Sequence, residues 1–219
     1  MNDVASIGIA EVKEAIYLTI KRTVDIIAGL VGLILLVPIS LIIKIISICS
    51  KDYDSIFYTQ NRIGKNGKEF KLYKFRSMVP NADQVLEELL KSDKKLAKEY
   101  KINKKLKEDP RITKAGKFIR KTSLDELPQL INVLKGEMTL IGNRPYLPRE
   151  KEDMGLFYDD IIKTKPGITG YWQVSGRSNT TFEQRLKLES FYSLNRGLRM
   201  DIKIFFKTFS VVLFGKGAE

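Results

Sequence analysis

The chain has 219 residues, of which 38 are Lys or Arg and 26 are Asp or Glu, so its net charge is +12. This length fits one domain with appendages, and the charge indicates an anionic partner such as nucleic acid, membrane or a phosphorylated substrate. The absence of histidine and the single cysteine, Cys49, exclude imidazole catalysis, His-based zinc sites and disulfides within the chain.

The first distinctive segment is residues 26–43, a run of 18 residues without a charge, preceded by Lys21 and Arg22 and followed by Lys44. A spanning helix needs roughly 20 apolar residues, so this run is just long enough to be a membrane segment. No small-residue cleavage site is evident, so we do not expect a removable signal peptide.

Pro38 lies in the second half of this run, where it should kink or break a helix, and the Ser40 hydroxyl could satisfy a freed carbonyl. Basic flanks prefer the cytoplasmic side, so a helix that breaks near Pro38 and returns would satisfy both ends. A straight span is equally compatible with the residues, because spanning helices tolerate proline.

Residues 56–63 and 69–76 have the pattern of two strands, and Asn66-Gly67 between them is a typical turn, so we predict a β-hairpin. Lys74 and Arg76 should project from one side of the second strand, where both could bind a phosphate. A solvated strand face is the alternative.

Two further helices are predicted, one after the hairpin and one near the end of the sequence. The first covers residues 81–107 and is lysine-rich from Lys94 onward, so it could lie on an anionic leaflet or present a solvated face. The second, over residues 199–212, carries an aromatic and basic stripe, which fits an interfacial helix or a core helix.

The most informative stretch is residues 122–130, where apolar residues begin to recur at helical spacing: Leu127, Leu130, Ile131 and Leu134. This spacing predicts a short helix with Asp125 and Glu126 in its first turn. The free amides and the dipole of a first turn stabilise a carboxylate or a phosphate. A capping box between Ser123 and Glu126 would explain the same residues without any chemistry.

Four motifs occur in order along the chain: KFRSM at 74–78, DPRIT at 109–113, SLDELPQ at 123–129 and KPGITG at 165–170. Together with the membrane run they resemble the bacterial sugar transferase family, the monotopic polyprenyl-phosphate phosphoglycosyl transferases. The resemblance extends over almost the whole chain, from about residue 21 to about residue 215.

The resemblance implies an enzyme that moves a sugar-1-phosphate from a UDP-sugar to undecaprenyl phosphate and releases UMP. This reaction would begin capsule, exopolysaccharide or O-antigen synthesis. Asp125 would be the nucleophile that forms an aspartyl phosphosugar intermediate, and Asp125 and Glu126 would hold the required Mg²⁺. Glu126 could instead accept a proton from the incoming phosphate.

By the same resemblance three basic residues would hold phosphates: Lys74, Arg76 and Arg120. Arg144 and Pro145 would belong to a nucleotide-binding loop, which usually reads Gly-Pro-Arg-Pro in the family but has Asn143 in the second position here. Asparagine tolerates unusual backbone angles, so we expect the loop to keep its shape. Arg177 is a further candidate for substrate contact.

The implied fold is α+β and helix-rich, with an N-terminal segment (1–20), a re-entrant membrane helix (21–50) broken at Pro38, and one catalytic domain (51–219). The domain would carry the hairpin and interfacial amphipathic helices. It would face the cytoplasm at the bacterial inner membrane, in contact with anionic lipid, as a monomer or a homo-oligomer. Galactose or glucose is the expected sugar, with an N-acetylated amino sugar as the alternative.

Two other classes of function remain as alternatives. A nucleic-acid-binding protein would explain the charge, but its usual aromatic platform or zinc module is missing and the membrane run would have no role, so we expect no nucleic-acid partner. A non-catalytic membrane scaffold of a glycan-assembly complex would explain the anchor and the helices. The intact Asp125-Glu126 pair favours the enzyme.

Overall fold

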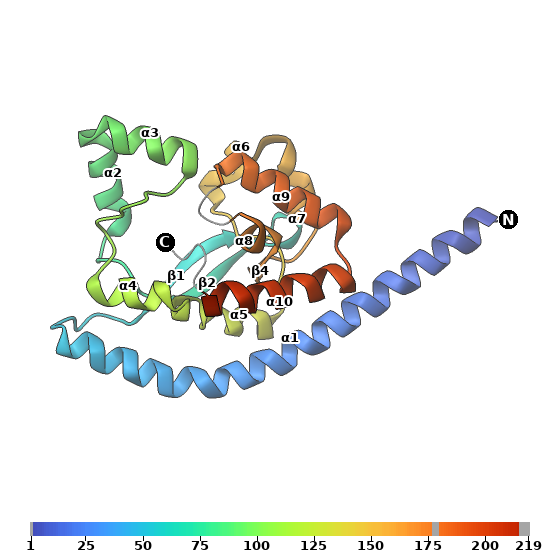
Figure 1. The fold of residues 1–219 in the computed structure, drawn as a ribbon, viewed down its shortest axis with the longest axis horizontal. Coiled ribbons are helices and arrows are strands. Elements are labelled where there is room, and N and C mark those ends of the chain that lie inside the picture. Colours follow the sequence, from blue (N-terminus) through green and yellow to red (C-terminus); the bar gives the residue numbers. More distant parts are fainter. Residues whose placement is uncertain (1, 177–179, 215–219) are drawn as a thin grey trace.

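The computed structural model describes residues 2–176 and 180–214 (Figure 1). The described strands are β1 (Phe57–Ile63), β2 (Glu69–Phe75), β3 (Thr139–Ile141) and β4 (Gly167–Thr169). The described α-helices are α1 (Asn2–Cys49), α2 (Ala82–Ser92), α3 (Lys94–Asn103), α4 (Lys114–Lys121), α5 (Gln129–Lys135), α6 (Lys151–Met154), α7 (Tyr158–Ile162), α8 (Tyr171–Ser175), α9 (Phe182–Asn195) and α10 (Leu198–Phe214). The predicted helix-rich α+β class is confirmed.

The strands form two small sheets. In the antiparallel hairpin of β1 and β2, Phe57 pairs with Phe75 and Ile63 with Glu69, and its turn has Asn66 and Gly67 at positive φ. The hairpin prediction is therefore confirmed. Strands β3 and β4 pair in parallel and connect distant parts of the chain.

Helix α1 runs as one long curved helix along one side of the domain (Figure 1). It is long and apolar enough to cross a membrane over Gly8–Cys49. The expected division into two helices at Pro38 is not seen, because α1 continues through the proline. The Ser40 hydroxyl donates to the carbonyl of Leu36 at 2.7 Å, not to the carbonyl of Ile34 that the proline leaves free.

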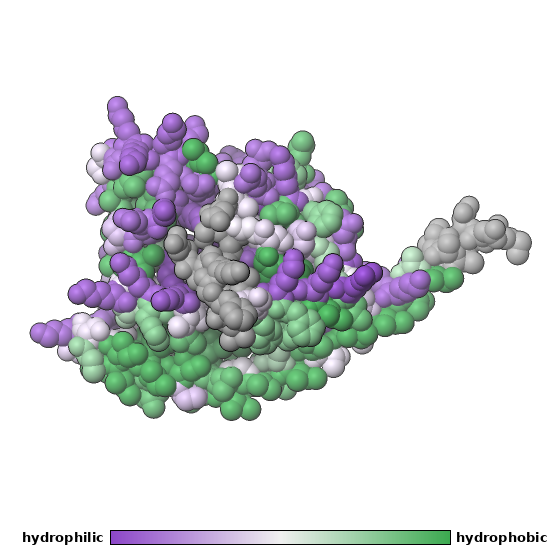
Figure 2. All heavy atoms as spheres, in the orientation of Figure 1, coloured by the Kyte–Doolittle hydropathy of each residue, from purple (hydrophilic) through white to green (hydrophobic). Residues whose placement is uncertain are grey.

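The outer side of α1 is covered by exposed apolar side chains, which form a continuous band along that edge of the molecule (Figure 2). The helix predicted over residues 81–107 is divided into α2 and α3, because Asp93 accepts hydrogen bonds from the amides of Lys95 and Leu96 and so begins α3. Both helices lie on the hydrophilic side opposite α1, which favours the solvated face for the lysine-rich region over contact with the leaflet of the apolar band (Figures 1 and 2).

The inner side of α1 packs closely on α5. A Cβ atom at Gly32 would lie 2.1 Å from a methyl carbon of Leu130, and one at Gly29 would lie 2.6 Å from a methyl carbon of Leu134. Arg22 donates to the last carbonyls of α5, those of Val133 and Leu134, at 2.6 and 2.8 Å. These glycines therefore let two backbones approach, while Arg22 satisfies the end of the shorter helix.

We expect Gly32→Leu to lower the free energy of unfolding by about 1–3 kcal/mol, because the added side chain overpacks the contact between α1 and α5. A Cβ atom at Gly8, on the same helix, would have no neighbouring atom within 4 Å, so Gly8→Leu is the matched control. Thermal unfolding in detergent measures both variants. Equal melting temperatures for the two would contradict this packing.

Candidate active site

The acidic pair lies on a short 3-10 turn, Leu124–Glu126, between α4 and α5. It is not in the first turn of the predicted α-helix, because α5 begins only at Gln129, after Pro128. The capping box is also absent: within the described residues the Ser123 side chain makes no capping bond, and its backbone has φ 57°. The simplest structural explanation of the acidic pair is therefore removed.

Lys74 reaches the pair from strand β2. Its Nζ lies 3.5 Å from Oδ2 of Asp125 and 3.3 Å from Oε1 of Glu126. The Asp125 side chain is 13% exposed and the Glu126 side chain 33% exposed. Two carboxylates that share one ammonium group and remain open to solvent can still accept a metal ion or a substrate.

Within the described residues, the other two predicted phosphate ligands form no ion pair with Asp125 or Glu126. Arg76 binds Asp52 at 2.7 Å and the carbonyl of Ser55 at 2.7 Å, so its guanidinium is used in the connection that follows α1. Arg120 is exposed at the end of α4. Among the described residues, Lys74 alone supplies a basic side chain within ion-pair distance of Asp125 and Glu126.

The motif at 109–113, just before α4, contains a largely buried ion pair that we call the Asp109–Arg111 clamp. Arg111 makes a bidentate contact with Asp109, at 2.8 and 2.6 Å, and also donates to the carbonyl of Ala82 at the start of α2. Burial acts to raise the pKa of Asp109, but the bonds from Arg111, with a contribution from the charge of Arg120, hold that pKa below its usual value. Arg120 therefore acts on the clamp, close to the acidic turn.

The loop 142–145 follows strand β3, and Asn143 in it is a core residue. Its side-chain amide donates to the carbonyl of Ile161, to Thr164 Oγ1 and to Ser193 Oγ, at 3.2, 3.2 and 2.5 Å. Its φ is not positive, so the expected tolerance of unusual backbone angles is not used. The asparagine instead connects the loop to α7 and α9.

The next residues of the loop lie among charged groups that the sequence reasoning missed. The amide of Arg144 donates to Oε2 of Glu189 at 2.7 Å, and the carbonyl of Pro145 accepts from Arg62 at 3.0 Å. Arg185 stacks on the ring of Trp172, 4.3 Å from its centre. Arg185 and Glu189 lie one turn apart on α9. Their spacing of four residues in the sequence was the pattern that could have indicated two charged side chains on one face of a helix. Arg177 lies outside the described residues.

The two adjacent carboxylates have the chemistry that Mg²⁺ requires. This ion prefers oxygen ligands and is usually held by one or two carboxylates together with substrate phosphates and water. Among the described residues no group of three or more acidic or thiol side chains gathers into a complete metal site. Asp125 and Glu126 could therefore supply two of the oxygen ligands of a bound metal ion.

These motifs and this geometry agree with a comparison against known families, in which residues 16–215 match the bacterial sugar transferases. The chain belongs to the bacterial sugar transferase family. This member is 48% identical over 199 residues to the UDP-galactose-lipid carrier transferase of Erwinia amylovora and 47% identical over 199 residues to the undecaprenyl-phosphate galactose phosphotransferase of Salmonella typhimurium. Both alignments cover 91% of this sugar transferase chain but only 41% of the relative.

A shorter relative matches along most of its length. The exopolysaccharide production protein ExoY of Sinorhizobium fredii is 39% identical over 198 residues, which cover 90% of this chain and 87% of that protein. The bacterial sugar transferase region described here is thus comparable in extent to that relative.

Burial raises the pKa of Glu189 to about 8, above its usual value near 4.5, although the hydrogen bond from the Arg144 amide and the charges of Arg144 and Arg185 oppose the shift. Between these two pH values the folded chain keeps a proton that the unfolded chain has lost, so this group makes stability fall as pH rises. We expect the free energy of unfolding of Glu189→Gln, measured relative to that of the parent, to rise progressively from about pH 5 to pH 8.

Melting temperature measured across this pH range tests the assignment. Glu183→Gln is the matched control, because Glu183 is on the same helix and its bond to Lys187 holds its pKa below its usual value. Parallel curves for the parent and Glu189→Gln would contradict the raised pKa.

Proposed function

We propose that this chain transfers a sugar-1-phosphate from a UDP-sugar to undecaprenyl phosphate and releases UMP, as the first membrane step of capsule, exopolysaccharide or O-antigen synthesis. The observation that carries the proposal is the pair Asp125 and Glu126, held by Lys74 on a turn that packs against the membrane helix. The names of two relatives support galactose as the sugar, with glucose as the second donor to test.

In the proposed mechanism, an oxygen of Asp125 attacks the phosphorus that carries the sugar. A bond forms between this oxygen and phosphorus, the bond to the UMP oxygen breaks, and UMP leaves with the electron pair. A phosphate oxygen of undecaprenyl phosphate then attacks the aspartyl phosphosugar, which releases the product and restores the carboxylate. The Lys74 ammonium offsets negative charge around the transferred group.

Asp125 and Glu126 would hold Mg²⁺, which when bound offsets charge on the phosphate oxygens. Glu126 has a second available role, because its carboxylate is more exposed than that of Asp125 and could accept a proton from the incoming phosphate. The loop with Arg144 and Pro145 would bind the nucleotide end of the donor.

The position of the turn supports a lipid acceptor. Leu124 and Leu127, on either side of the acidic pair, pack against a buried cluster that includes Leu36 and Ile43 of α1. The acidic pair is therefore close to the exposed apolar band, where the polyprenyl chain can remain in lipid while its phosphate reaches the site (Figure 2).

We further propose that α1 enters the cytoplasmic leaflet of the inner membrane and returns to the same side. The helix contacts the polar domain along its length, from the ion pair of Glu14 with Arg196 to the packing of Ile43. A straight span would carry this domain into the bilayer, which its charged surface opposes. The exposed apolar residues of α10 lie beside α1 and would rest in the anionic interface: Leu198, Ile202, Phe205, Phe206 and Phe209.

A single cysteine near the N-terminus tests this topology. In a chain with Asp3→Cys and Cys49→Ser, we expect protection from an impermeant thiol reagent in intact cells and labelling after permeabilisation. Labelling from outside intact cells would instead indicate a straight span.

The transfer itself is tested with Asp125→Asn. We expect the detergent-solubilised chain with Mg²⁺ and undecaprenyl phosphate to release UMP from UDP-galactose, and Asp125→Asn to lower kcat by about three orders of magnitude or more, because it removes the nucleophile. Asp159→Asn makes the same chemical change at an exposed position on α7 and should retain activity. A folded parent chain that releases no nucleotide from a panel of donors would favour the scaffold.

A further inference from the structure

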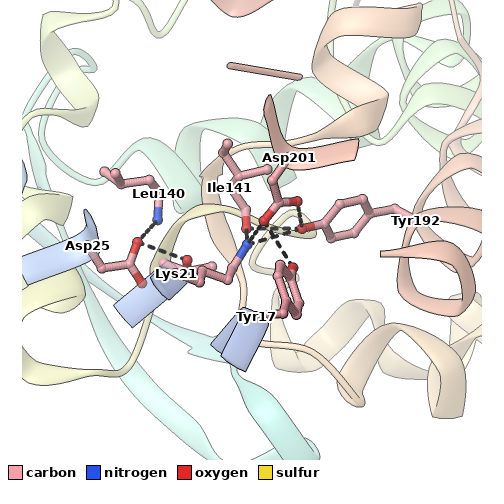
Figure 3. A network of polar contacts seen from close by, with 8 residues as sticks. Tyr17, Lys21, Asp25, Leu140, Ile141, Tyr192 and Asp201 are labelled. Atoms are coloured by element: carbon pink, nitrogen blue, oxygen red, sulfur yellow. Dashed lines mark hydrogen bonds and ion pairs between the residues drawn. The ribbon is translucent and has the colours of Figure 1, made fainter. Parts of the chain in front are cut away.

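Lys21 lies on α1 yet points into the domain (Figure 3). Its Nζ donates to the carbonyl of Ile141 at 2.7 Å and to Tyr192 Oη at 3.3 Å, and it forms an ion pair with Asp201. The Lys21 side chain is only 16% exposed. Lys21 is one of the flanking charges that the positive-inside rule would place at the membrane surface, yet its side chain is bound within the protein.

Asp25 continues this contact one helical turn further along α1. Its Oδ1 accepts from the amide of Leu140 at 2.8 Å (Figure 3). The same oxygen accepts from Thr139 Oγ1 at 3.0 Å. Lys21 and Asp25 thus supply one donor and one acceptor to the strand β3, as a neighbouring strand would. The position of β3 depends on α1.

Strand β3 leads directly into the loop 142–145, and the backbone contacts there leave no space for adjustment. A Cβ at Gly142 would lie 2.5 Å from the carbonyl oxygen of Lys165, and one at Gly167 would lie 2.1 Å from the amide of Gly142. A Cβ at Gly170 would lie 2.1 Å from the carbonyl oxygen of Gly142. Because these backbones touch, a shift of β3 must move the loop that carries Arg144.

We propose that Lys21 is a positioning residue for donor binding, which acts through the carbonyl of Ile141 on the loop 142–145. The membrane helix then supports the nucleotide end of the site as well as anchoring the chain. The identity of the donor rests on the proposed function, whereas the link from Lys21 to the loop does not.

Hydrogen exchange of the full chain in detergent tests this link without any assay of activity. In Lys21→Met we expect amide exchange to rise at least tenfold over residues 139–147, where the amides of Gly142 and Arg144 are hydrogen-bonded. Exchange in the hairpin, residues 57–75, should stay unchanged. Lys13→Met removes the same charge from an exposed position on α1 and should alter neither region.

Lys21→Met also leaves Asp201 buried without its cation, which by itself can destabilise the fold. The double variant Lys21→Met with Asp201→Asn removes that charge and should show the same local increase in exchange. Unchanged exchange over residues 139–147 in both variants, or an equal rise over the whole domain, would overturn the proposal.

Steady-state kinetics give the second readout. We expect Lys21→Met to raise the KM for UDP-galactose about tenfold and to leave the KM for undecaprenyl phosphate unchanged, and Lys21→Arg to recover part of the donor affinity. Equal changes in both KM values, or a loss of kcat alone, would overturn the positioning role. A parent chain inactive with every UDP-sugar would refute the proposed function and leave the exchange result valid.

Discussion

The face that α1 turns toward the domain makes polar contacts in one half of the helix and apolar contacts in the other. Its opposite face is apolar and exposed. In the first half of the helix this inner face is polar, with Lys21 and Asp25 bonded to β3. Further along, Gly32 permits close approach to α5, and Leu36 enters a buried apolar cluster. Polar contacts fix the register of the helix, whereas the apolar contacts remove surface from water.

The apolar cluster that includes Leu36 also positions both parts of the site, the acidic turn and Lys74. The turn with Asp125 rests on the apolar cluster through Leu124 and Leu127. Lys74, which contacts the pair, is followed in β2 by Phe75, and Phe75 belongs to that cluster. The anionic and cationic groups are therefore set by one packed layer, and their separation does not depend on a flexible connection.

Features with a local cause could be predicted from the sequence. The hairpin turn follows from Asn66-Gly67, since these two residues adopt positive φ more readily than others. The binding of Arg76 to Asp52 could not be predicted, because the chain offers several acids and the choice depends on how α1 ends. The capping box fails because Pro128 begins α5 later than the apolar spacing implied. The role of Lys21 could not be found, because periodicity does not say which face of an apolar helix meets protein.

The length of the contact between α1 and the domain means that the membrane helix is not a removable tether. A chain that began at residue 51 would leave the carbonyls of Val133 and Ile141 without their donors from α1. It would also expose the buried side chains of Phe75 and Ile119, which pack with Leu36. The polar domain and α1 therefore form a single folding unit, so the long apolar helix is a condition of the folded state and not an addition to it.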